Sequence, residues 1–93
     1  MTADDELRDL LGQQVVVDTR SSYIHLGTLH SFGECFVTLR DVDVHDINDS
    51  HSTKEVYIMN ARRLGIQRNR ASVKILRTDV VSVSLLSDVL VFE

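Results

Sequence analysis

The stretch YIHLGTLHSF, residues 23–32, decides the fold class of this chain. Apolar and polar side chains alternate up to Leu26, which is typical of a β-strand that buries one face. Beyond Gly27 the apolar positions are Leu29 and Phe32, so the alternation changes phase. A glycine at such a change is typical of a bulge or bend, because no side chain obstructs it. The stretch therefore predicts one long, strongly curved strand.

Four further segments have the same character and predict the other strands of one sheet. They are rich in β-branched residues, are bounded by polar turns, and cover residues 14–18, 36–44, 72–77 and 80–86. The alternation in 36–44 slips once, around Arg40 and Asp41, and the apolar tail 88–93 is expected to pair with the last strand. Five short, bent, antiparallel strands predict a mainly β fold in which the sheet curls into a small barrel.

The N-terminal segment predicts a short helix ahead of the sheet. Residues 4–11 carry leucines at helical spacing, and Thr2 or Asp4 is suited to cap the first turn. Gly12 follows directly and supplies the stop. The fold expected from the residues is therefore a helix followed by five strands.

A second helix is predicted from Lys54 to Leu64. Ser52 and Glu55 have the spacing of a capping box, and Gly65 is placed to end the helix. The alternative is a strand, because Val56-Tyr57-Ile58-Met59 has high strand propensity. The helix is favoured by its caps.

The 93 residues predict a single domain, 1–93, because a chain of this length has no room for a second core. Residues from about 45 to 71 form an insertion before the last two strands, and it begins with a polar loop, 45–53. Charge is segregated along the chain. The net charge is −4, yet residues 54–77 hold seven bases and one acid. Such a segment suits a polyanion or the acidic part of a neighbouring subunit.

Composition predicts a cytoplasmic protein. The start of the chain, Met1 to Glu6, is acidic and lacks the basic and apolar regions of a signal peptide. No apolar run approaches the ~18 residues that a membrane span needs, so no membrane association is expected. Cys35 is the only cysteine, which fits a reducing compartment.

In order and spacing, the segments resemble the Sm/LSm family. The first Sm motif corresponds to Val15–Asp18, Gly27–Phe32 and Val37–Val42, and the second to Ile75–Val83. The resemblance implies a helix followed by a five-stranded Sm-like barrel. It also implies a homo-oligomeric ring, joined through strand edges, that binds single-stranded RNA.

Two positions depart from the family's pattern. RNA-binding members carry an Asp, an aromatic residue or His, and an Asn where this chain has Gly33-Glu34-Cys35-Phe36, and the Gly after the conserved Arg is Thr78 here. The alternative function is therefore a protein–protein interaction scaffold that keeps the Sm fold without the usual RNA pocket.

The candidate RNA-binding residues lie in the basic insertion and the turn that follows it. Arginine binds phosphate bidentately and stacks on bases, and tyrosine offers a stacking platform. The candidates are Arg62, Arg63, Arg68, Asn69, Arg70, Arg77 and Tyr57. Tyr23 is a second exposed platform, whereas Phe32 and Phe36 are expected in the core. The competing interpretation, on equal footing, is that the arginines pair with Asp41 and Asp43 of a neighbouring subunit or are simply solvated.

No catalytic or metal-binding pattern is predicted. His45, Asp46, Asp49 and His51 cluster only in the polar loop, where nothing fixes their spacing, so they are interpreted as a solvated loop. Cys35 is expected to be a semi-buried small apolar residue. The chain has no phosphate-cradling glycine loop, nucleophile elbow or paired carboxylates. We therefore expect no enzyme activity, no cofactor and no small-molecule substrate.

Overall fold

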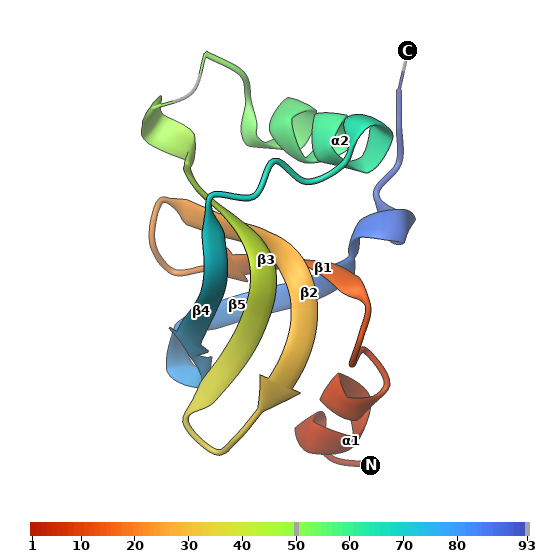
Figure 1. The fold of residues 1–93 in the computed structure, drawn as a ribbon, viewed down its shortest axis with the longest axis vertical. Helices are drawn as coiled ribbons and strands as arrows, with labels where there is room; N and C mark the ends of the chain where they lie inside the picture. Colours follow the sequence, from red (N-terminus) through yellow and green to blue (C-terminus); the bar gives the residue numbers. More distant parts are fainter. Residues whose placement is uncertain (50, 93) are drawn as a thin grey trace.

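Five antiparallel strands form one strongly bent sheet (Figure 1). The computed structural model describes residues 1–49 and 51–92. The strands are β1 (Gln14–Thr19), β2 (Tyr23–Phe32), β3 (Phe36–Asp46), β4 (Arg70–Leu76) and β5 (Val80–Leu85), in the order β4-β3-β2-β1-β5. The predicted mainly β class, with an N-terminal helix and five bent strands, is confirmed. The sheet is unclosed, because β4 and β5 are its two edges, so it is a barrel only in outline.

The sheet bends at the two places where the alternation slips. Pairing between β2 and β3 shifts register between Leu26 and Thr28, across Gly27. A Cβ at Gly27 would lie 3.0 Å from the carbonyl oxygen of Arg40, so a larger residue would require the backbone of β3 to move by a few tenths of an ångström. Asp41 in β3 has a φ of 52°, which reverses the side-chain alternation beyond it.

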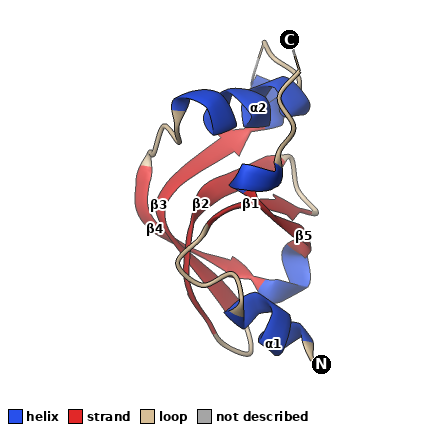
Figure 2. Cartoon of the chain, turned by 90° about the vertical axis from the view of Figure 1, so that its right-hand side faces the viewer, coloured by secondary structure: helices blue, strands red, loops and turns tan. Residues whose placement is uncertain are grey.

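The bends give the sheet two apolar cores, one on each face. The first core is made of Val15, Val17, Leu29, Val37, Leu39, Val42 and Ile75, and the second of Val16, Ile24, Leu26, Ile58, Ala61 and Leu86. The second core lies between the sheet and α2 (Lys54–Leu64). Figure 2 shows α2 across one end of the bent sheet and α1 (Ala3–Arg8) at the other.

The N-terminal helix is shorter than the predicted span of 4–11. It ends at Arg8, and Leu10 and Leu11 lie in the turn that leads to Gly12, whose φ is 81°. Thr2 is the cap, as predicted: its side chain accepts from the backbone N–H of Asp5, whose carboxylate accepts from the backbone of Thr2.

The segment 54–64 is a helix and not the alternative strand. It ends at Gly65, as predicted, but its cap is Thr53 and not Ser52. The Thr53 hydroxyl accepts from the backbone N–H of Val56 at 3.2 Å. The cap is one residue further on because Thr53 is the last extended residue before the helical turn.

Two further expectations are corrected. β3 continues to Asp46 and a 3-10 turn follows at Ile47–Asp49, so His45 and Asp46 lie in a strand and not in a loop; Ser50 lies outside the described residues. The tail does not pair with β5. A 3-10 turn at Leu86–Asp88 redirects the chain towards α2, where the backbone N–H of Phe92 donates to Sδ of Met59; Glu93 lies outside the described residues.

The turn from β2 to β3 is also more open than predicted. Cys35 is exposed rather than semi-buried, and Phe36 is 40% exposed rather than part of the core. Phe32 is partly buried and packs against the first core. Among residues 1–49 and 51–92, no helix is long and apolar enough to span a bilayer.

Candidate nucleic-acid interface

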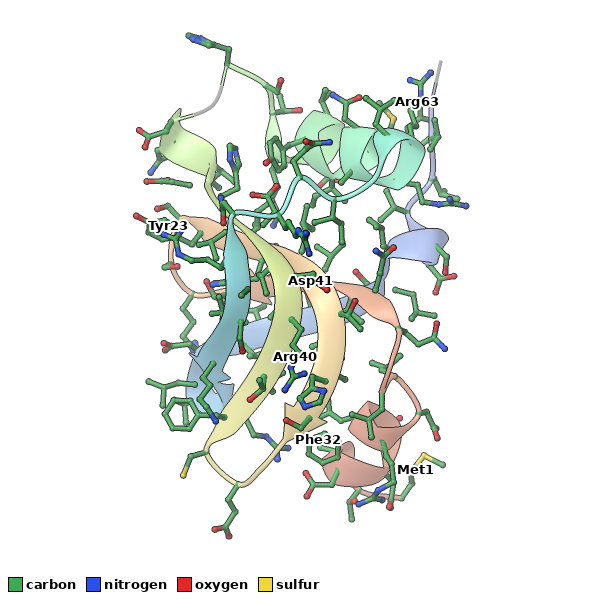
Figure 3. All side chains as sticks on the ribbon, in the orientation of Figure 1. Met1, Tyr23, Phe32, Arg40, Asp41 and Arg63 are labelled. Carbon is green, nitrogen blue, oxygen red and sulfur yellow. The ribbon has the colours of Figure 1, made fainter. Side chains whose placement is uncertain are left out.

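The structure divides the predicted RNA-binding residues among three places. Arg62 and Arg63 lie in the last turn of α2, which Figure 3 shows beside the C-terminal tail. Arg68 and Asn69 precede β4 and Arg70 begins it. Arg77 follows the opposite end of β4, and Tyr57 lies on the side of α2 that packs against the second core. The seven residues therefore do not form one continuous surface.

Arg77 fastens three segments of the chain together. Its guanidinium donates to the carbonyl oxygen of Gly33 at 2.8 Å and pairs with the carboxylate of Asp4 at 2.8 Å. It also lies over the ring of Phe32, 5.9 Å from the centroid. Arg77 thus joins β4, α1 and the β2–β3 turn, and both of its terminal nitrogens already have a partner within the chain.

Arg68 is paired within the chain. Its guanidinium lies 2.7 Å from the carboxylate of Asp41, and both side chains are exposed. Such a pair contributes little to stability, on the order of 0–1 kcal/mol. It nevertheless neutralises Asp41, the exposed carboxylate in the middle of β3.

Asp43 is a buried carboxylate, 3% exposed, held by two neutral donors. The phenol O–H of Tyr57 donates to one of its oxygens, and the side-chain amide of Asn69 donates to the other at 3.3 Å. Asn69 also exchanges two hydrogen bonds of 3.0 Å with the backbone of Val44. Burial, and then the neighbouring Asp43 carboxylate, raise the pKa of Tyr57. These contacts fasten α2 and the approach to β4 onto β3.

Tyr57 already has a stacking partner inside the protein. Its ring lies parallel to that of His45, with the centroids 3.7 Å apart and the planes 7° from parallel. The structure therefore uses one face of Tyr57, and its hydroxyl, for packing. Tyr23, the other predicted platform, is exposed at the start of β2.

The structure places two further basic residues, Arg40 and Lys74, near the predicted Arg70. Arg40 of β3 is exposed, and its register partner on β4 is Ser72, which lies between Arg70 and Lys74. We call Arg40, Arg70 and Lys74 the basic strand face. Figure 3 shows Arg40 in front of β3, below α2 and away from it. The alternation of side chains in the sequence could have predicted this, because Val37 and Leu39 face inward and Arg40 therefore faces outward.

The two edge strands of the unclosed sheet are β4 and β5. β4 and β5 each pair with one neighbour, β3 and β1 respectively, so one side of each backbone has no strand beside it. Exposed edges of this kind accept a strand from another chain.

Comparison with known proteins finds similarity in structure alone. No protein-family model and no curated protein matches the chain. Among solved structures, the Pyrococcus abyssii Sm protein in complex with a uridine heptamer superposes with a TM-score of 0.62 and 15% identity, covering 91% of this chain and 99% of that one. The P. aerophilum SmAP1 heptamer has a TM-score of 0.62 and 24% identity, over 91% and 93% of the two chains. The chain has the Sm fold.

The resemblance expected from the two motifs is thus confirmed at the level of fold. A chain in the crystal structure of the NatC complex bound to CoA also superposes, with a TM-score of 0.57, 18% identity, and coverage of 85% of this chain and 82% of that one. Identities this low establish the shared architecture and leave the ligand to be argued from the residues.

In this Sm fold the turn at Gly33–Phe36 has no Asp or Asn side chain. Instead, the carbonyl oxygen of Cys35 accepts from the backbone N–H of Arg77 at 2.8 Å, and that of Gly33 accepts from the Arg77 side chain. Within the part of the chain that the structure describes, no three His, Cys, Asp or Glu side chains form a group that could hold a metal ion.

Proposed function

We propose that this chain is a subunit of a homo-oligomeric Sm-like ring that binds single-stranded RNA and acts by binding, without enzyme activity. The observation that carries the proposal is the unclosed antiparallel sheet, with β4 and β5 as free edges, in a chain with the Sm fold. Joining β5 of one copy to β4 of the next covers both edges, and a series of such contacts closes when the copies are related by rotation.

The RNA component of the proposal rests on charge and on the neighbours. Two of the neighbours are described as a complex with a uridine heptamer and as a heptamer. In this chain the predicted residues Arg62, Arg63, Arg68, Asn69, Arg70, Arg77 and Tyr57 lie around α2 and β4. The overall charge of −4 argues against indiscriminate binding and favours a localised contact. A cytoplasmic location is part of the proposal, because a single exposed cysteine suits a reducing compartment.

Two measurements test the proposal. Light scattering on the purified protein is expected to give a mass that is a multiple of 10.5 kDa. Fluorescence anisotropy with single-stranded homopolymer RNAs is expected to show binding that weakens as salt rises. A monomeric mass would contradict the ring, and the absence of binding to every homopolymer at low salt would contradict the RNA component.

A protein–protein scaffold is the second candidate, and a groove beside β5 favours it. The groove lies between α2, the end of β5 and the tail, and is lined mainly by apolar side chains that include Val56, Met59, Leu85, Leu90 and Phe92. The NatC neighbour is itself part of a complex. A partner that co-purifies after nuclease treatment and is lost in a Met59→Glu variant would support this function.

A further inference from the structure

The outer surface of β3 and β4 combines positive charge with exposed apolar side chains. We propose that single-stranded RNA lies along this surface, with its phosphates on Arg40, Arg70 and Lys74 and a base stacked on Phe36. The inference rests on the RNA binding proposed above and assigns it to the strand surface that begins at Phe36, the first residue of β3, and continues away from the β2–β3 turn.

Burial and register place Arg40 and Lys74 on one outward face, and burial adds Arg70 at its edge. In β4, Val73 and Ile75 face the first core, so Ser72 and Lys74 face outward. Arg70 is exposed at the start of the strand, where its register partner is Val42 of the first core. Arg40 lies opposite Ser72, and Thr38 lies opposite Lys74. Alternate residues on a strand are roughly 7 Å apart. The patch therefore presents three cationic groups at intervals along two adjacent strands.

Nothing on the same strands cancels this charge. β2 and β4 contain no acidic residue. β3 has three acidic residues. Asp41 is neutralised by Arg68, and Asp43 is buried beneath Tyr57 and Asn69. Asp46 ends the strand, opposite Tyr23, and accepts from the backbone N–H of Asn48. Arg40 and Lys74 have no ion pair with any residue that the structure describes. The guanidinium and ammonium groups are thus available to a polyanion.

The basic strand face ends in an apolar pair. Phe36 lies opposite Leu76, one register step beyond Val37 and Ile75, and the two side chains are 40% and 46% exposed. An exposed aromatic ring beside cationic side chains is the arrangement by which proteins hold single-stranded nucleic acid without reading its sequence. The missing Asp and Asn at the β2–β3 turn agree with such sequence-tolerant binding.

Ring formation leaves the basic strand face available. The hydrogen-bonding groups of an edge strand point sideways, within the plane of the sheet, whereas its side chains project above and below that plane. A strand added beside β4 therefore occupies its backbone edge and leaves the outward side chains of Arg70 and Lys74 in solvent.

The test compares two double variants that each remove two positive charges. Arg40→Gln/Lys74→Gln changes the basic strand face. Arg8→Gln/Arg20→Gln changes exposed arginines on α1 and on the β1–β2 turn, which are not among the three bases of that face. Anisotropy with fluorescent single-stranded oligo(U) and oligo(A) is measured from ~50 to ~200 mM salt, after circular dichroism and light scattering have established that each variant folds and assembles.

The Arg40→Gln/Lys74→Gln variant is expected to bind both RNAs one to two orders of magnitude more weakly at ~50 mM salt, with a salt slope shallower by about 1.4, because each lost phosphate contact removes about 0.7. The Arg8→Gln/Arg20→Gln variant should retain most of the affinity. Phe36→Leu, which keeps an apolar side chain, is expected to weaken binding about tenfold through lost stacking.

Equal affinities of the two double variants for RNA would overturn the surface assignment while leaving RNA binding in place. If the wild-type protein bound neither RNA, the proposed RNA function itself would fail, so the two failures are distinguishable. A loss of affinity confined to one of the two RNAs would also contradict the inference, since phosphate contacts and stacking act on any sequence.

Discussion

The hydroxyl of Tyr57 is a donor to a carboxylate that is almost wholly buried. Tyr57→Phe keeps the stacking on His45 but leaves Asp43 with one weaker donor, the amide of Asn69. Loss of a donor to a buried charged group costs about 1–3 kcal/mol. We therefore expect the free energy of unfolding, measured in urea at pH 7, to fall by that amount.

Tyr23→Phe is the matched control, because Tyr23 is exposed and its hydroxyl has no partner among the hydrogen bonds of the described residues. Its change in unfolding free energy should stay within about 0.5 kcal/mol. Equal effects of the two substitutions would show that the Asp43 contact adds nothing to stability.

His25 makes the stability of the fold depend on pH. It lies in the interior of the bend, where burial lowers its pKa, and its Nδ1 has no hydrogen-bond partner among the described residues. The unfolded chain takes up a proton near pH 6.5, whereas the folded chain resists it until a lower pH. Stability is therefore expected to decrease as pH falls through 6.5.

The measurement is the urea midpoint at a series of pH values from about 7.5 to 5. His25→Gln should flatten this profile, because the titrating group is gone. His30→Gln, a change at an exposed imidazole on the same strand, should leave the profile as in the wild type. A profile in His25→Gln as steep as the wild-type one would contradict the assignment.

Individual residues differ in how far their sequence context reveals their role. Gly27 and Asp41 could be predicted as bends, because the apolar alternation slips at both. Asp43 could not be distinguished from a solvated acid, since its partners Tyr57 and Asn69 are 14 and 26 residues away. Phe36 was wrongly expected in the core, because hydrophobicity alone does not tell which face of a strand end is covered. Arg40 could not be grouped with Arg70 and Lys74 from the sequence, because the pairing of β3 with β4 brings together residues about 30 positions apart.

The helix α2 depends on its cap for a defined start. Thr53 accepts from the N–H of Val56, and no large apolar stripe compensates for its loss, because only Ile58 and Ala61 are buried. Thr53→Ala is expected to lower the free energy of unfolding by about 1 kcal/mol. Thr53→Ser retains the hydroxyl and should lower it by only a few tenths. Urea unfolding followed by far-ultraviolet circular dichroism measures both, and equal losses in the two variants would contradict the capping role.

Helices and strands were predicted well where the spacing of apolar residues agrees with the residues that start and end the element. Residues 54–64 have a cap, helical continuity and a terminal glycine, and these outweigh the strand propensity of Val56–Met59. The tail was predicted wrongly for a related reason: residues 88–93 are apolar like a strand, but the turn at Leu86–Asp88 directs them to the side of α2. Which surface covers an apolar segment is a property of the tertiary fold, and local pattern does not contain it.

The assembly as a whole is expected to depend on the two open edges of the sheet. Val81 on β5 is an apolar residue that is 63% exposed in the single chain. A lysine on an edge strand disfavours pairing with another strand, because the ammonium group must lose its water. Val81→Lys is therefore expected to shift the mass measured by light scattering from a multiple of 10.5 kDa towards 10.5 kDa itself.

The control is Leu64→Lys, which introduces the same charge at a more exposed apolar residue, 78% exposed, at the end of α2. It should leave the mass of the assembly unchanged, because α2 lies on a face of the sheet and not along β4 or β5. Since an oligomer is favoured by concentration, the comparison is made over a hundredfold dilution series. If Leu64→Lys dissociates the assembly and Val81→Lys does not, the contact between copies runs through α2, and the ring is not built on the strand edges.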